Sequence, residues 1–318
     1  EQWQPNSEKG DATWEPQFLL KPYVLKGGGT ILYAPPKEFK SYISMLIAQS
    51  VNSGCNLLGE CMYTNSLFVN LERSPSSVRG RLARVNRALG LAPDSELHMF
   101  HARGRSLRSL EAPLARYIAQ QNIEFGVLDS LSRTGSGSLI KDEDINPIID
   151  ILNRLFPSWL AIAHTPRASS DHPYGGIFWD AGADLLLQLK TQKKGEHKIG
   201  LSLTVSSAND IALPPPTLFE ADFSEGFSFH HTSTRHYPDL AGIKSLVMAE
   251  DILLYLQGLD TGCATATQVF TELGYNRANV ASLFSKDPRF TLVRKSPKGA
   301  FYGPASTPQK ALDNTPPL

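Results

Sequence analysis

A lysine–serine pair and two acidic residues could together act on a phosphate ester. Lys40 and Ser41 follow an apolar strand and a proline-rich turn, and they open a predicted helix. At such a junction, backbone N–H groups and the helix N-terminus bind phosphate oxygens, lysine adds a positive charge, and serine can bind magnesium. Glu72 and Asp129 follow two further apolar strands. Phosphoryl transfer to water requires one carboxylate near the metal ion and one that orients or deprotonates the water.

The loop before Lys40 departs from the usual phosphate-loop pattern. The pattern G-x-x-x-x-G-K-[ST] has glycines where this chain has Ala34 and Phe39. Alanine is a mild change, whereas phenylalanine is a severe one if that position requires a positive φ. Taken alone, the segment fits either a phosphate loop or an ordinary strand-to-helix turn. The predicted nucleotide-binding residues are Ala34, Pro35, Pro36, Lys37, Glu38, Phe39, Lys40, Ser41 and Tyr42.

The elements that would position these residues alternate along the chain. Apolar runs alternate with helical periods between residues 30 and 205, which is typical of a parallel sheet with helices on both faces. One of these helices is predicted to have Asn146 as its cap and Pro147 in its first turn. Ligands bind at the carboxyl edge of such sheets, where a third strand end, His164, could sense a γ-phosphate. The predicted strands are residues 30–33, 67–71, 125–129, 159–164, 184–189 and 199–205.

Four segments carry a family resemblance when they are taken in chain order: LYAPPKEFKS, FVNLERSP, GVLDSLSR and AIAHTPR. Together they resemble the RecA-like ATPases of the RepA type, which are ring-forming plasmid and phage helicases and their relatives. The resemblance implies that the chain binds ATP and Mg²⁺, with Lys40 and Ser41 on the phosphates and the metal ion. It also implies that Glu72 is the catalytic base, Asp129 the metal-associated acid and His164 the sensor.

The same resemblance implies a homo-oligomeric ring, expected to be a hexamer. Ring ATPases of this class complete each site with a basic residue from the neighbouring subunit, which stabilises the transition state. Lys193 and Lys194 are candidates for that role, and an exposed β-turn is the alternative interpretation. Residues 134–146 and 165–176 occupy positions that carry channel-facing loops in such rings, although ordinary surface loops also fit them.

Composition limits the classes of partner. The chain has 318 residues, and its 31 Lys and Arg residues equal its 31 Asp and Glu residues, so it has no global attraction to nucleic acid. No apolar run approaches the roughly 20 residues of a membrane helix, and residues 1–14 do not have the pattern of a signal peptide. We therefore expect a cytoplasmic protein without a membrane partner. Its 3 cysteines lack the spacing of a zinc site or a disulfide framework.

Two regions are locally basic. Residues 73–116 contain nine arginines and no lysine against three acids. They could bind a polynucleotide, meet an acidic neighbour in a ring, or form a solvated helix face. Residues 276–299 contain six basic residues against one acid.

The second basic region belongs to a small unit with three predicted helices, residues 249–257, 266–273 and 276–285, and a hairpin of residues 289–294 and 300–302. This is the order of a winged helix, whose third helix enters a DNA groove and whose hairpin contacts phosphates. Winged helices also dock proteins, so that use stays open. The predicted DNA contacts are Arg277, Asn279, Ser282, Lys286, Arg294, Lys295 and Lys298.

The sequence thus predicts an α/β fold, a RecA-like P-loop NTPase core with a mainly parallel sheet followed by a small winged-helix domain. The expected function is that of an ATP-hydrolysing, DNA-associated ring, a helicase or an ATP-driven switch, which acts with other proteins in replication or maintenance of a plasmid, phage or other mobile element. The alternative is a DNA-binding scaffold with a degenerate phosphate loop, which Phe39 favours. The predicted boundaries are an extension at 1–14, the ATPase domain at 15–210, a connector at 211–242, the winged helix at 243–304 and a mobile tail at 305–318.

Overall fold

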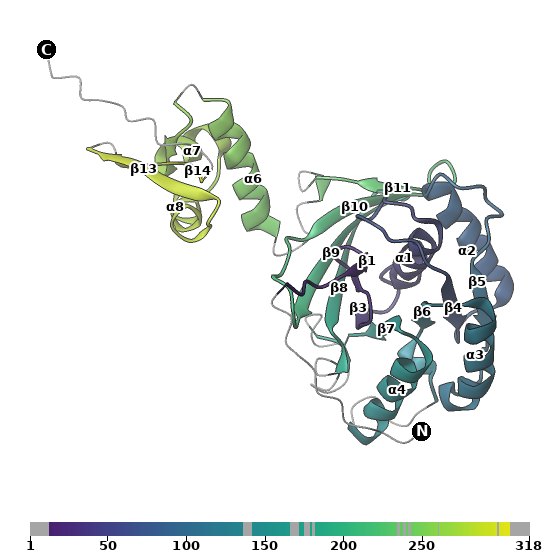
Figure 1. Ribbon diagram of the computed structural model, residues 1–318. Coiled ribbons are helices and arrows are strands. Elements are labelled where there is room, and N and C mark those ends of the chain that lie inside the picture. The colour runs from purple at the N-terminus through teal and green to yellow at the C-terminus, as the bar shows by residue number, and fades with distance from the viewer. Residues whose placement is uncertain are drawn as a thin grey trace, which may run out of the picture. The chain divides into compact units, whose positions relative to one another are not determined.

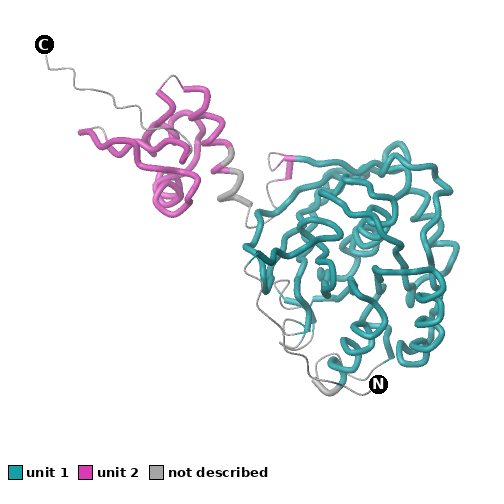
Figure 2. The backbone as a smooth tube through the Cα atoms, in the orientation of Figure 1, with its two compact units in different colours: residues 1–232 teal, residues 233–318 magenta. Residues whose placement is uncertain are grey.

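The protein divides into two compact units, residues 1–232 and 233–318, which Figure 2 shows in different colours. In this computed structural model, residues 142–143, 243–247 and 250 are described by their backbone alone. The described residues are 13–135, 142–165, 172–174, 179, 182–233, 236–237, 240, 243–259, 261–297 and 299–305.

The larger unit is built on a nine-stranded mixed sheet of order β11-β10-β9-β8-β3-β7-β6-β4-β5 (Figure 1). From β8 to β5 in that order the strands pair in parallel, whereas β8 to β11 pair antiparallel. Two short strands, β1 (Phe18–Leu20) and β2 (Val24–Leu25), pair separately. The strands of the sheet are β3 (Gly29–Ala34), β4 (Ser66–Asn70), β5 (His98–His101), β6 (Phe125–Asp129), β7 (Ser158–His164), β8 (Leu185–Lys194), β9 (Lys198–Ala208), β10 (Thr217–Asp222) and β11 (Ser228–His231).

Helices cover both faces of this sheet, as the sequence predicts. In the central strand β3, Leu32 belongs to the core cluster that contains α1 and α2, whereas Ile31 and Tyr33 belong to the cluster that contains α3 and α4. This alternation is the period of a strand that is buried on both faces. Among the residues that the structure describes, no helix is both long and apolar enough to cross a membrane. The helices are α1 (Lys40–Ser53), α2 (Pro75–Ala88), α3 (Leu107–Gln121) and α4 (Asp142–Leu155), and the short 3₁₀ helix η1 is Leu131–Arg133.

The predicted connector, residues 211–242, was wrong, because β10 and β11 belong to the main sheet. Strand β10 pairs with β9 along its whole length, and its Phe219 is completely buried. The larger unit therefore continues to residue 232 rather than to 210. Both strands are short, and the proline run that precedes them hides their apolar period.

Two further details differ from the sequence prediction. The chain turns within residues 195–197, with Gly195 at φ 67°, and β9 returns antiparallel to β8 because so short a turn cannot make a parallel crossover. Helix α4 begins at Asp142 rather than at a cap on Asn146, so Pro147 lies inside the helix. The acidic run before Pro147 favours this earlier start, since negative charge stabilises a helix N-terminus.

The described part of the smaller unit contains three α-helices and a three-stranded sheet of order β12-β14-β13. Thr265 and Gln268 form a capping box at α7, and the side chain of Asn276 caps α8. Its core includes Ile252, Val269 and other apolar side chains from all three helices. The short strand β12 has no signal in the sequence. The elements are α6 (Ile243–Gln257), β12 (Ala264–Thr265), α7 (Ala266–Leu273), α8 (Arg277–Lys286), β13 (Phe290–Ser296) and β14 (Gly299–Pro304).

Candidate active site

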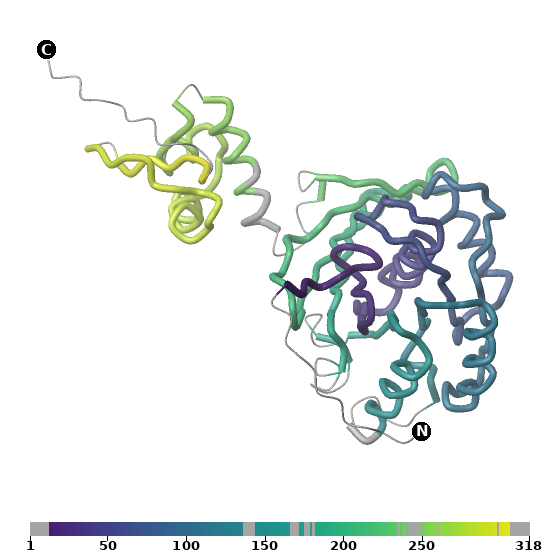
Figure 3. Tube along the Cα trace, viewed as in Figure 1, coloured from purple at the N-terminus to yellow at the C-terminus, as the bar shows by residue number. Residues whose placement is uncertain are grey.

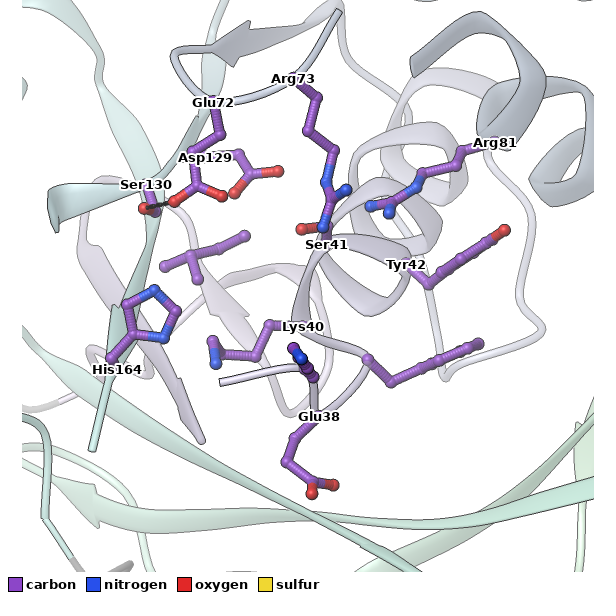
Figure 4. A pocket seen from close by; sticks show the side chains of 13 residues that line it. Glu38, Lys40, Ser41, Tyr42, Glu72, Arg73, Arg81, Asp129, Ser130 and His164 are labelled. Atoms are coloured by element: carbon purple, nitrogen blue, oxygen red, sulfur yellow. Dashed lines mark hydrogen bonds between the residues drawn. The ribbon is translucent and has the colours of Figure 1, made fainter. Parts of the chain in front are cut away.

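The carboxyl ends of β3, β4, β6 and β7 meet around a cavity of about 250 Å³, which we call the nucleotide cavity after the ligand that the sequence predicts for it (Figure 4). The colours of Figure 3 show that these neighbouring strands come from distant parts of the chain. Parallel pairing places their ends at one edge, so the predicted residues converge there. Of these, the lining includes Lys37, Glu38, Phe39, Lys40, Ser41, Tyr42, Glu72, Asp129 and His164. Arg73, Arg81, Ser130 and Ile162 also line the cavity and were not predicted as site residues.

Lys40 is the first residue of α1 and is 5% exposed. Its Nζ donates hydrogen bonds to the carbonyl oxygens of Ala34 at 2.7 Å and Pro35 at 2.6 Å. Burial lowers its pKa to about 8, and nearby carboxylates partly oppose that shift. The ammonium group is therefore poorly solvated, and an anion in the cavity would stabilise its charge.

Ser41 and Asp129 both line the cavity, and the nearby Ser41 hydroxyl partly opposes the effect of burial on the Asp129 pKa. Asp129 is 3% exposed, and burial together with the charge of Glu72 raises its pKa to about 6. These two oxygen donors suit Mg²⁺, which binds to one or two protein ligands and completes its shell with phosphates and water. Within the described residues there is no group of three or more His, Cys, Asp or Glu side chains that could hold a metal ion by themselves.

Glu72 lies on the turn after β4, and its Oε1 accepts hydrogen bonds from Ser130 Oγ at 2.5 Å and Ser132 Oγ at 3.4 Å. The turn is held by Asn70, a fully buried residue whose Oδ1 accepts from the backbone N–H groups of Glu72 and Arg73. Sequence reasoning missed Asn70 and both serines, although they stand in the segments that carried the resemblance. A buried amide before the acidic turn was the available signal.

His164 ends β7 beside Ala34 of β3. Burial lowers the pKa of its imidazole, and the charge of Lys40 lowers it further, so the ring is neutral near pH 7. Its Nδ1 is buried and has no hydrogen-bond partner among the described residues. Figure 4 shows the ring next to Lys40 on the cavity wall. A ligand atom in the cavity could satisfy this nitrogen.

Phe39 adopts the backbone conformation that a glycine would take in its place. Its φ is 59° and its ψ is 3°, and Lys37 is also left-handed with φ 69°. The ring of Phe39 stacks on Tyr42, with centroids 4.6 Å apart, and packs against Phe223 and Phe227. Such a conformation costs roughly 1–2 kcal/mol, and each aromatic pair stabilises by about 0.5–1.5 kcal/mol. The aromatic cluster of these four rings thus offsets the missing glycine.

Two arginines of the basic region at residues 73–116, Arg73 and Arg81, line the nucleotide cavity. They therefore do not belong to a solvated helix face. The Arg81 guanidinium lies 5.0 Å from the ring centroid of Tyr42, and burial lowers the Arg81 pKa. In Figure 4 both guanidinium groups lie on the side of the cavity where Ser41 stands. The next residue along this face, Arg84, donates to the Tyr42 hydroxyl at 2.9 Å.

Five of the predicted catalytic and nucleotide-binding residues do not line the cavity. Ala34 and Pro35 contribute only the carbonyl groups bonded to Lys40, and Pro36 does not reach it. Lys193 and Lys194 are the last residues of β8 and are exposed. Beside them, the Thr191 hydroxyl donates to the carboxylate of Glu38. The nearby charges of Lys40 and Lys193 partly oppose the rise in the Glu38 pKa that burial causes.

The predicted DNA contacts lie in the smaller unit, where Val280, Leu283 and Phe284 face inward as expected. Arg294 lies 4.5 Å from the ring centroid of Phe301. Lys298 and parts of the two predicted channel loops lie outside the described residues. The exposed predicted contacts are Arg277, Asn279, Ser282 and Lys286 on α8 and Arg294 and Lys295 on β13.

A family model described as "AAA domain" matches residues 3–166. The matched range contains every residue that lines the nucleotide cavity and ends two residues after His164. No curated protein matches the chain.

Proposed function

The chain belongs to the AAA domain family, a family of P-loop ATPases in the RecA-like superfamily, and on this premise we propose that it binds ATP with Mg²⁺ in the nucleotide cavity and hydrolyses the γ-phosphate. One observation carries the proposal. Lys40, Ser41, Glu72 and Asp129, which come from three distant segments, line one cavity at the carboxyl edge of the sheet.

Binding rests on the phosphate loop and its neighbours. The Lys40 ammonium, now held by two loop carbonyls, exchanges part of that contact for phosphate oxygens. Ser41 and Asp129 are the residues that would hold Mg²⁺, which would supply positive charge next to the phosphates. Arg73 and Arg81 add positive charge on the same side of the cavity.

Hydrolysis requires an oriented water molecule, and Glu72 is the acid available to accept its hydrogen bond. The two serine hydroxyls on its Oε1 fix the carboxylate and leave Oε2 without a partner among the described residues. His164 is neutral and carries an unsatisfied ring nitrogen, so it is suited to hydrogen-bond the terminal phosphate.

We also propose a finer role, that of a RepA-like helicase or ATP-driven switch that works as a ring. In this ring, Lys193 and Lys194 would complete the nucleotide cavity of the neighbouring subunit. Both lysines are exposed at the end of a hairpin, which supports a contact between subunits. The smaller unit has the element order of a winged helix and exposes polar and basic residues on α8 and β13, which supports DNA as a partner. Replication or maintenance of a mobile element is the setting proposed for both.

The test is ATP turnover by the full chain with Mg²⁺, with and without DNA. Lys40→Ala should abolish turnover and weaken nucleotide binding, whereas Glu72→Gln should abolish turnover and leave binding intact. Lys26→Ala and Glu60→Gln, which change exposed residues of the same unit, are the matched controls. Wild-type protein that binds no nucleotide contradicts the proposal. Binding without turnover favours the scaffold that the altered phosphate loop suggests.

A further inference from the structure

A second cavity, of about 500 Å³, lies at the same edge of the sheet in the larger unit. We call it the arginine cavity. It is built by the loops that follow β4, β5 and β6. Glu72 lines both this cavity and the nucleotide cavity.

Three arginines give the arginine cavity its charge. Arg103 and Arg105 stand on the loop after β5, and Arg133 ends η1. All three are exposed, and within the described part of the chain their guanidinium groups form no ion pair. Glu72 is the one acid in the described lining, and two serines already bond to its carboxylate. The net charge of the lining is therefore positive.

The two arginine-bearing loops are fixed to each other by backbone contacts. The N–H of Leu107 donates to the carbonyl oxygen of Thr134 at 2.8 Å. A Cβ added to Gly135, where φ is 72°, would lie 2.9 Å from the Cβ of Ser106, so the loops meet at a glycine. The backbones that carry the three arginines are thus fixed to each other, which lowers the entropy that the loops lose on binding.

The chemistry of the lining selects phosphate groups. No aromatic side chain lines the cavity among the described residues, and its one large apolar residue, Leu71, is 2% exposed. A nucleobase would need a ring on which to stack, and a docking peptide would need an apolar anchor. Guanidinium groups bind phosphate oxygens in pairs. The arginines line a cavity of about 500 Å³, and a recess of this kind suits one flexible strand better than a rigid duplex.

We infer that the arginine cavity binds the phosphate backbone of single-stranded nucleic acid and communicates with Glu72. Binding itself does not require the proposed ATPase; only the communication rests on it. The path is short, because Ser132 lines the arginine cavity, lies 2.8 Å from Ser130 Oγ, and together with Ser130 contacts Glu72 Oε1. A strand phosphate at Arg133 would redirect the neighbouring Ser132 hydroxyl and so change how Glu72 is held.

Strand binding is measured with the full chain and a fluorescent oligothymidylate, without nucleotide. Arg105→Ala/Arg133→Ala removes one arginine from each loop and should weaken binding at least about tenfold, with a salt slope less steep by about 1.4, since each single-strand phosphate contact contributes about 0.7. Arg87→Ala/Arg116→Ala removes two exposed arginines outside the cavity and should stay within about twofold of wild type. Equal weakening by both pairs, or by neither, overturns the inference.

Three ligands distinguish the occupants of the cavity. An abasic oligonucleotide should show the same loss in the Arg105→Ala/Arg133→Ala protein, because bases make no contact. Polyglutamate and unlabelled oligothymidylate of equal charge are compared as competitors of the labelled strand. If polyglutamate displaces the strand equally well, the inference is overturned in favour of an acidic protein. Pyrophosphate that binds in an arginine-dependent way while the strand does not overturns it in favour of a free phosphate compound.

The communication with Glu72 is measured as the ratio of ATP turnover with the strand to turnover without it. The Arg105→Ala/Arg133→Ala protein should bring this ratio close to one at strand concentrations that saturate wild type, and the control pair should keep the wild-type ratio. If the Arg105→Ala/Arg133→Ala protein keeps the wild-type ratio, the inferred communication between the arginine cavity and Glu72 is wrong. If wild type hydrolyses no ATP, the proposed function fails. The binding assay without nucleotide still shows whether the arginine cavity binds a single strand.

Discussion

The two cavities of the larger unit lie at one edge of one sheet and share Glu72, yet they treat charge in opposite ways. In the nucleotide cavity, Lys40 and Asp129 are almost completely buried, and burial shifts both of their pKa values toward neutrality. In the arginine cavity, the guanidinium groups are exposed and form no ion pair within the described residues.

The difference follows from what each cavity would have to do. Chemistry on a phosphate requires few charges, fixed and shielded from water, because electrostatic stabilisation grows as the surroundings become less polar. Holding a long polyanion requires many solvated charges that exchange partners, and such binding is sensitive to salt. One sheet edge can present both kinds of surface because its successive loops are buried to different depths.

Asp129→Asn should have the largest effect. It removes the buried carboxylate beside Ser41, so ATP turnover should fall by about 100-fold or more. Nucleotide affinity should also lose its dependence on Mg²⁺. Turnover and nucleotide binding measured across a Mg²⁺ titration test both effects. Asp150→Asn, which changes an exposed acid on α4, is the control, and a wild-type Mg²⁺ response in the Asp129→Asn protein contradicts the assignment.

Substitution of Phe39 should have the next largest effect, which is a loss of free energy of unfolding. Phe39→Ala removes the ring from the aromatic cluster and leaves a Cβ in the left-handed region, so we expect a loss of about 3 kcal/mol in the free energy of unfolding. Phe39→Gly also removes the ring but relieves the backbone, so it should be about 1 kcal/mol more stable than Phe39→Ala. Urea unfolding followed by tryptophan fluorescence reports on the larger unit, which contains all 4 tryptophans. An alanine variant that is the more stable of the two contradicts this account.

Phe39 also marks where sequence reasoning reaches its limit. The strands that carry Lys40, Glu72, Asp129 and His164 were predictable because buried parallel strands are continuous apolar runs. Two of the rings that offset the missing glycine, Phe223 and Phe227, were not. They come from residues taken for a connector, more than 180 positions along the chain, and no local pattern indicates a packing partner at that distance.

The arginines show the same limit on a shorter scale. Arg73 and Arg81 face the nucleotide cavity and Arg103 and Arg105 face the arginine cavity, although all four belong to one basic region of the sequence. Charge counting identifies such a region without distinguishing its members. The orientation of α2 and the path of the loop after β5 divide them, and both depend on tertiary packing.

The pH dependence of stability should follow Asp129. Its pKa in the nucleotide-free protein is raised to about 6 from the usual 3.8, so the folded state binds this proton more tightly than the unfolded chain does. The residue therefore costs stability above pH 6, and the cost vanishes as the pH falls toward 4. Asp129→Asn should raise the free energy of unfolding by about 2 kcal/mol at pH 7.5 and by little at pH 4. Urea unfolding at both pH values measures this, and a difference that does not vary with pH contradicts it.

The smallest expected effect is a difference in pH dependence between the two cavities, because one binds its ligand with a lysine and the other with arginines. The pKa of Lys40 is lowered to about 8, so its ammonium group loses its proton as the pH rises from 7 to 9. A bound triphosphate favours the charged form, and ATP affinity should therefore fall by up to about tenfold over this range. Guanidinium groups keep their charge there, so strand binding at the arginine cavity should stay constant. Isothermal titration with ATP and anisotropy with oligothymidylate, at matched ionic strength, compare the two. A parallel fall in both affinities would show that the cavities do not differ in this way.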